Sequence, residues 1–152
     1  MFNQLDKPQA GETIAIMKTN HGTMKLRLFE ERVGECATNF IELAKQGKYD
    51  GAPFHRIIKN FMIQGGDFTN RNGTGGHSAK GPGTTIGDKY DPCLSHMRGA
   101  LSWAKTAMPN SIGSQFFTER LQQRSGISLF SGTSKQHQCF HSSPLPSCCS
   151  KL

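Results

Sequence analysis

The stretch that decides the fold is Tyr49-Asp50-Gly51-Ala52-Pro53-Phe54-His55-Arg56-Ile57-Ile58-Lys59-Asn60-Phe61-Met62-Ile63-Gln64-Gly65-Gly66-Asp67. Its segments Pro53–Lys59 and Phe61–Gln64 are rich in apolar and aromatic residues, and Asn60 separates them. Short runs of this kind, bounded by turn residues, are typical of β-strands. The stretch therefore predicts two short neighbouring strands, the second of which ends at Gly65.

Side chains alternate between the two faces of a strand. Arg56 therefore shares a face with Phe54 and Ile58, and Met62 shares a face with Gln64. If these faces meet, a guanidinium group lies beside a thioether, an amide and the ring of Phe61. This arrangement predicts an apolar pocket with one cation and one hydrogen-bonding group at its edge.

Upstream, a hairpin is predicted from Thr13–Met17 and Thr23–Leu28, because a turn signal that contains Gly22 separates these two runs. The second run alternates strictly between apolar and polar residues, which predicts one inward and one outward face. The inward residues are Met24, Leu26 and Leu28, and the outward residues are Thr23, Lys25 and Arg27.

One amphipathic helix is predicted over Glu35–Gln46, where apolar residues recur at helical spacing and Gly47 follows as a cap. Asn70–Gly87 is a long glycine-rich loop, which in a compact domain indicates function or disorder. Two further short strands are predicted over Gly99–Ala104 and Ser114–Phe117.

The predicted pocket contains neither a nucleophile next to a base nor a pair of carboxylates, and His55 faces away from Arg56. It suits a reaction that breaks no σ bond, such as rotation about an X-Pro amide, whose barrier is about 18–20 kcal/mol. A donor aimed at the prolyl nitrogen stabilises the twisted transition state, and Arg56 can supply it. Phe61, Met62 and Phe117 can hold the pyrrolidine ring.

Five segments carry a specific resemblance. Phe54-His55-Arg56 with Phe61–Asp67, Asn72–Gly76, Arg98–Ser102 and Gly113–Phe117 resemble, in order and spacing, segments of the cyclophilin family. The resemblance implies a cofactor-free isomerase with an eight-stranded antiparallel barrel and two capping helices. It implies that Arg56 is catalytic, that the Asn72–Gly76 loop forms part of the adjoining groove wall, and that the substrate groove is formed by Phe61, Met62, Gln64, Ala104, Lys105, Gln115 and Phe117.

The chain departs from the family pattern in three places. Trp103 stands where a smaller inward residue is usual, so a strained core is expected. Lys105 replaces an asparagine whose backbone usually contacts substrate. After Phe117 the family's last strands and second helix have no counterpart, and a frameshifted or mis-spliced reading frame would produce such a tail.

The predicted fold is therefore mainly β, a cyclophilin-like antiparallel β-barrel with one capping helix, incomplete at its C-terminal end. Residues 1–117 form the isomerase domain, and residues 118–152 form an unrelated, disordered Ser/Cys-rich tail.

The predicted function is peptidyl-prolyl cis-trans isomerisation that assists protein folding. The implied partners are proline-containing peptides, unfolded or folding proteins and a cyclosporin-type ligand. Two alternatives stay open, since the groove lacks its closing wall. In the first, the chain is a non-catalytic module that binds proline peptides. In the second, it is an inactive truncated cyclophilin that does not fold.

Charge and composition exclude several other classes. The net charge of +7 divides unevenly, with +4 over residues 1–117 and +3 over residues 118–152, and the chain lacks the basic and aromatic clusters typical of nucleic-acid binding. No apolar run reaches the length of a membrane span, and the N-terminus does not resemble a signal peptide, so a cytoplasmic protein is expected. His137, Cys139 and His141 do not have the spacing of a zinc site, so no metal is expected.

Overall fold

The structure, a computed structural model, describes residues 2–119 and, as backbone only, Ile127–Thr133. Strands dominate this part of the chain, which confirms the predicted mainly β class. The described elements are β1 (Ile14–Thr19), β2 (Gly22–Leu28), α1 (Glu30–Val33), α2 (Glu35–Lys45), β3 (Arg56–Ile58), β4 (Met62–Gly65), β5 (Leu101–Trp103), β6 (Phe116–Glu119) and β7 (Ile127–Thr133).

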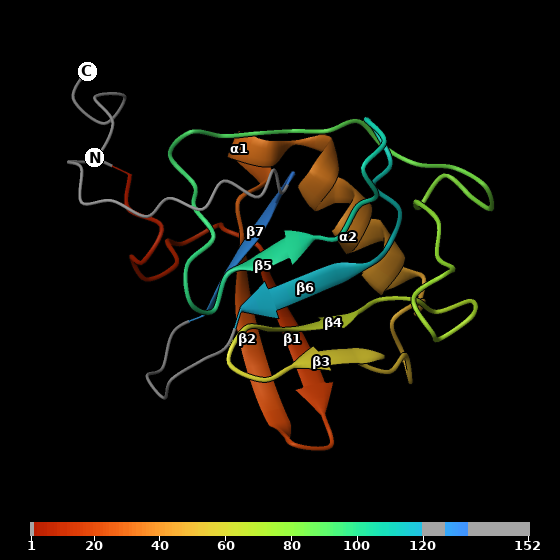
Figure 1. Cartoon of the computed structure of the whole chain (residues 1–152). Coiled ribbons are helices and arrows are strands. Elements are labelled where there is room, and N and C mark those ends of the chain that lie inside the picture. Colours follow the sequence, from red (N-terminus) through yellow and green to blue (C-terminus); the bar gives the residue numbers. More distant parts are fainter. Residues whose placement is uncertain (1, 120–126, 134–152) are drawn as a thin grey trace.

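The strands form one curled sheet in the order β1-β2-β7-β5-β6-β4-β3 (Figure 1). Neighbouring strands are antiparallel, except that β7 runs parallel to β2 and to β5. A cleft of about 810 Å³ is lined both by the β1–β2 hairpin and by β3 and β4. Among the described residues no ladder joins β1 to β3, so the described part of the barrel is open along this seam, as expected for an incomplete barrel.

The predicted hairpin is present, with β1 and β2 paired in register from Ile14 opposite Arg27 to Thr19 opposite Gly22. The outward placement of Arg27 is wrong, because its side chain is only 6% exposed. Its guanidinium forms an ion pair with Glu12 and lies over the ring of Phe29. An apolar–polar pattern cannot detect this burial, because a buried arginine is tolerated once it is paired.

The predicted helix is also present as α2, which buries Ala37, Phe40 and Leu43. The preceding single turn, α1, was not predicted, because four residues are too short to show helical periodicity. Gly34, with φ of 47°, separates the two helices. Both lie on the same side of the sheet in Figure 1, so one long capping helix covers the core beside a short second one.

The aromatic core accommodates Trp103, whose side chain is 1% exposed. The ring of Phe40 meets Trp103 edge-on at 6.2 Å and Phe116 edge-on at 5.8 Å between centroids. The indole nitrogen of Trp103 is buried and has no hydrogen-bond partner among the described residues. This unpaired donor is a cost to the core, and whether Trp103 also strains the packing stays a prediction.

The sheet continues past the predicted domain boundary at Phe117. β6 ends at Glu119, and the backbone of Ile127–Thr133 pairs with β2 and β5. The division into 1–117 and 118–152 stays a prediction, and most of the predicted disordered tail, with His137, Cys139 and His141, lies outside the described residues. No described helix is both long and apolar enough to cross a membrane.

Candidate active site

Three predicted site residues form a row across neighbouring strands. Arg56 on β3 pairs with Gln64 on β4, and Gln64 pairs with Phe117 on β6. Phe117 in turn pairs with Ser102 on β5. Residues directly opposite one another in a ladder project from the same face. The row therefore brings the cation, the amide and the aromatic ring together on one surface, as the two-strand analysis predicted for Arg56 and Gln64.

The cation of the row is exposed and held by one polar neighbour. The Arg56 guanidinium donates through Nη1 to Oε1 of Gln64 over 3.4 Å, which is a long hydrogen bond. Most of its N–H donors therefore remain available to a ligand. A guanidinium has five such donors in a rigid plane and keeps its charge at any physiological pH.

The amide of Gln64 is joined to that of Gln115. Gln64 donates through Nε2 to Oε1 of Gln115 over 2.9 Å. Gln115 then donates through Nε2 to the backbone oxygens of Gly73 and Gly75 over 2.9 and 2.8 Å. Both donors of Gln115 are thus occupied, so this residue links the glycine-rich loop to the row and offers a ligand no free side-chain N–H.

The glycine-rich loop folds around the carboxylate of Asp67, which is fully buried. Oδ1 accepts the backbone N–H groups of Thr69 and Asn70, and Oδ2 accepts those of Asn72, Gly73 and Gly75, over 2.8–3.2 Å. Burial alone would raise the pKa of Asp67, but these backbone donors hold it well below its usual range. The loop therefore already binds an internal anion.

This arrangement explains the glycines. A Cβ on Gly75 would lie 2.7 Å from Oδ1 of Asp67 and 2.0 Å from Oγ1 of Thr69, which real side chains do not tolerate. Gly73 has φ of 97°, a conformation that favours glycine. The loop's composition is thus required for its close approach to Asp67.

The predicted apolar residues of the site are Phe117, Met62 and Phe61. Phe117 is half-buried and stacks on the ring of His96, with centroids 5.7 Å apart. His96 accepts or donates a hydrogen bond with Ser102 through Nδ1 over 2.8 Å, and burial lowers its pKa. Met62 is 4% exposed, whereas Phe61, in the turn before β4, is 48% exposed. Of these three side chains, Phe61 and Phe117 are therefore more accessible to a ligand than Met62.

A hollow of about 300 Å³ lies beside the row. It is lined by Gln64, Ala104, Lys105 and Gln115, all predicted site residues, and by the Gly73–Gly76 loop. Ala104 is fixed opposite Gln115 by its backbone N–H, which donates to the Gln115 carbonyl over 2.9 Å. These four predicted residues thus share one hollow with the glycine-rich loop, whereas Arg56, Phe61, Met62 and Phe117 do not line it.

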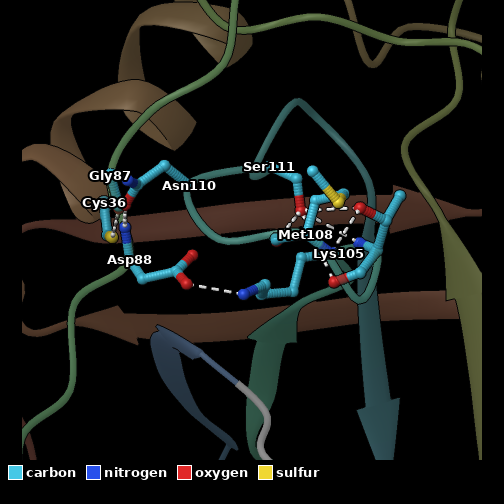
Figure 2. A network of polar contacts seen from close by, with 8 residues as sticks. Cys36, Gly87, Asp88, Lys105, Met108, Asn110 and Ser111 are labelled. Atoms are coloured by element: carbon cyan, nitrogen blue, oxygen red, sulfur yellow. Dashed lines mark hydrogen bonds and ion pairs between the residues drawn. The ribbon is translucent and has the colours of Figure 1, made fainter.

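The charged end of Lys105 is directed to another residue. Figure 2 shows its Nζ atom paired with a carboxylate oxygen of Asp88, at 2.5 Å. Asp88 is held in turn by its backbone N–H, which donates to Oδ1 of Asn110 over 3.0 Å. The ammonium group of Lys105 is therefore engaged in an ion pair with Asp88. Only the backbone and the aliphatic part of the Lys105 side chain remain to line the hollow.

Asp67, His96 and Asp88 are site-supporting residues that the sequence analysis missed. Asp67 ends the quoted stretch and precedes several glycines, which is a weak signal for a carboxylate that binds backbone N–H groups. His96 and Asp88 carry no local signal, because their partners Ser102 and Lys105 meet them only through tertiary packing.

The larger cleft at the β1–β2 and β3–β4 seam is not this site. Its lining residues Ile57, Ile63 and Phe116 project from the face opposite the row, since they alternate with Arg56, Gln64 and Phe117. None of the predicted site residues lines it. The smaller hollow is therefore the better candidate, because four predicted site residues line it and one of them, Gln64, belongs to the row.

The groups in the row exclude covalent catalysis by a base-activated nucleophile. The ring nitrogens of His55 are buried without a hydrogen-bond partner among the described residues, and His55 alternates with Arg56. No group of three metal-ligating side chains occurs in the part of the chain that the structure describes. What the row offers is a cation and an amide beside an apolar surface.

Comparisons with known proteins identify the family. The sequence model of the family described as cyclophilin type peptidyl-prolyl cis-trans isomerase/CLD matches residues 14–128, past the last motif of the sequence analysis. A putative bifunctional phosphatase/peptidyl-prolyl cis-trans isomerase of Streptococcus pyogenes is 48% identical over 116 residues, which are 76% of this chain and 24% of the relative. A putative peptidyl-prolyl cis-trans isomerase of Staphylococcus aureus is 42% identical over 123 residues, 80% of this chain and 60% of the relative.

Solved structures give the same result. A cyclophilin type peptidyl-prolyl cis-trans isomerase of Cryptosporidium parvum superposes with a TM-score of 0.67 at 37% identity, over 72% of this chain and 67% of that one. Its structure in the presence of the dipeptide Ala-Pro gives a TM-score of 0.66, over 71% of this chain and 68% of that one. Both bacterial relatives are longer proteins, of which the chain spans about a quarter and three-fifths.

Proposed function

The chain belongs to the cyclophilin-type peptidyl-prolyl cis-trans isomerase family, and on this premise we propose that its groove catalyses rotation about X-Pro peptide bonds. The observation that carries the proposal is the row of Arg56, Gln64 and Phe117, which are direct neighbours across β3, β4 and β6. The row combines an apolar seat for a proline ring with a cation at its edge.

Catalysis by this row requires only rotation. The planar amide is held by resonance, and the twisted transition state leaves a lone pair on the prolyl nitrogen. Arg56 donates a hydrogen bond to that lone pair, which does not accept one in the planar ground state. Because the interaction is stronger in the transition state than in the substrate, it raises the rate of the step itself.

The neighbouring groups position the substrate. Phe117 and Phe61 contact the pyrrolidine ring, and Met62 supports them from below. Gln64 uses one N–H for Gln115 and keeps the other, which can donate to a substrate carbonyl. The adjoining hollow, lined by Ala104 and Lys105, receives the residues on one side of the proline.

The proposed partners are proline-containing peptides and unfolded or folding proteins, and the proposed role is assistance of protein folding. A proline-binding groove of this kind also fits a cyclosporin-type ligand. Support comes from the Cryptosporidium parvum relative, whose structure was solved in the presence of Ala-Pro. The cytoplasmic location expected from the sequence remains part of the proposal.

A coupled assay with a proline tetrapeptide tests the function. Arg56→Ala should lower kcat/KM by about a hundredfold, the cost of removing one well-placed transition-state donor. Lys59→Ala is the matched control, because Lys59 is an exposed cation outside the row and its loss should change kcat/KM by less than about twofold. Wild-type turnover that survives Arg56→Ala would refute the mechanism.

The same experiment separates the enzyme from a binding module. Saturable binding of the peptide by the wild-type chain, without any rate enhancement, would show that the groove binds proline but does not catalyse. A thermal melt followed by circular dichroism should show one cooperative transition, and its absence would favour an unfolded product.

A further inference from the structure

We propose that Asp67 is a positioning residue for Arg56. Its carboxylate acts through the glycine-rich loop and the two glutamine amides, and it sets the direction in which the guanidinium presents its donors. The inference rests on the proposed isomerase function, since it assigns a further residue to the same site.

The first link joins Asp67 to the loop. Five backbone N–H groups between Thr69 and Gly75 converge on its two oxygens, and Thr69 adds its hydroxyl at 3.2 Å. This hydroxyl also accepts the N–H of Gly76 over 2.7 Å. The loop also has side-chain hydrogen bonds among Asn70, Asn72 and Thr74. Because Asp67 accepts five of its backbone N–H groups, including those of Gly73 and Gly75, we infer that the carboxylate fixes where the carbonyl groups of these two glycines point.

The second link has a fixed polarity. Backbone carbonyl oxygens only accept hydrogen bonds, so they require the NH2 group of Gln115 to face the loop. Its Oε1 must then face Gln64, and this oxygen also only accepts. Gln64 therefore turns its NH2 group toward Gln115 and its Oε1 toward the cation.

The third link reaches the catalytic group. The guanidinium of Arg56 only donates, so it matches the oxygen that Gln64 presents. A flip of either amide would place two donors or two acceptors against each other, which costs a hydrogen bond in a partly buried site. The Gly73 and Gly75 carbonyl oxygens thus set the polarity of the chain of bonds, and Asp67 holds the residues that carry them in place.

The chain of bonds matters because Arg56 is exposed. A free arginine side chain populates many rotamers, and ordering it during the reaction lowers the rate. The hydrogen bond to Gln64 restricts Arg56 before substrate arrives. Loss of Asp67 should therefore act on the rotation step more than on substrate binding.

Asp67→Asn is the direct test. The amide keeps the shape of the carboxylate, but it presents an NH2 group to backbone N–H groups of the loop, which can only donate. We expect kcat to fall about tenfold with KM changed less than twofold. In an Arg56→Ala background the same substitution should change kcat/KM less than about twofold, since the residue through which it acts is gone. Asp50→Asn, at an exposed aspartate, is the matched control and should leave kcat unchanged.

A second readout does not depend on turnover. The Nε–Hε resonance of Arg56 in a ¹⁵N spectrum, assigned by its loss in Arg56→Ala, should shift or broaden in Asp67→Asn and stay in place in Asp50→Asn. If the wild-type chain does not isomerise peptides, the proposed function fails, while this resonance still decides whether Asp67 positions Arg56.

Gln115→Glu covers the case in which Asp67→Asn does not fold, because its carboxylate cannot donate to the Gly73 and Gly75 carbonyl oxygens. It should lower kcat and move the Arg56 resonance in the same way. An unchanged Arg56 resonance in the folded variant, or an equal loss of activity with and without Arg56, would overturn the proposal.

Discussion

Phe116 and Phe117 allow a sharp test, because they are neighbours on β6 that face opposite sides of the sheet. The test replaces each by leucine, which is the same chemical change at adjacent positions. Phe116 is 4% exposed and its ring meets Phe40, Tyr49 and Phe54 edge-on, with centroids 5.5–6.2 Å apart. Phe117 is half-buried, and among the described residues its ring stacks on His96 alone.

The expected stability costs follow from these contacts. An aromatic pair contributes about 0.5–1.5 kcal/mol beyond the area it buries. Three such contacts are weakened at Phe116, so Phe116→Leu should cost about 2–3 kcal/mol, or about 6–12 °C in Tm for a domain of this size. One contact is lost at Phe117, so Phe117→Leu should cost about 1 kcal/mol and about 3–5 °C.

The expected losses of activity have the opposite order to the losses of stability, because Phe117→Leu should lose more activity than Phe116→Leu. Phe117 forms the seat for the proline ring in the proposed mechanism, and its replacement should lower kcat/KM about tenfold, which corresponds to about 1.4 kcal/mol. Phe116 points into the core, and its replacement should lower kcat/KM less than threefold when the assay is run well below its Tm. Thermal melts and the proline-peptide assay on the two variants measure both effects. A reversed order, with Phe116→Leu the less active and the more stable variant, would refute the assignment of faces.

Two further predictions concern strain and pH. Gly66→Ala should destabilise the domain by about 3 kcal/mol or more in a denaturant melt, because φ is 87° and the new Cβ would lie 2.4 Å from the Ser114 carbonyl oxygen. Gly81→Ala has a similarly positive φ of 123° but meets no atom within 4 Å, so it should cost only about 1–2 kcal/mol, and equal costs would show that the close contact is irrelevant. Burial lowers the pKa of His96 from its ordinary value of 6.5. Below about pH 6.5 the unfolded chain therefore binds a proton on this residue that the folded chain does not, so the stability of the fold decreases as the pH is lowered. Tm measured between pH 7 and pH 5 should fall less in His96→Asn than in the wild-type chain, and parallel curves would contradict this contribution.

Local sequence determined the individual elements and the residue types of the site. Strict alternation over 23–28 predicted the hairpin partner β2, and 3.6-residue spacing predicted α2, because both patterns depend only on neighbours in the chain. The same alternation predicts the face of Arg56 on its strand and that of Gln64 on the next, and the antiparallel pairing of β3 with β4 brings the two residues together. The resemblance added Gln115, which lies far from Arg56 in sequence.

Only the tertiary structure decided how these residues work together. The pairing of Gln64 with Phe117 depends on the register of β4 against β6, which are separated by about fifty residues, and no local pattern encodes it. Burial of Arg27 depends on Glu12, and the direction of Lys105 depends on Asp88, both of which arrive from other segments. Asp67 is the clearest case: an isolated aspartate in the sequence becomes the anion around which a loop folds, because its oxygens meet five backbone N–H groups only when the chain closes over them.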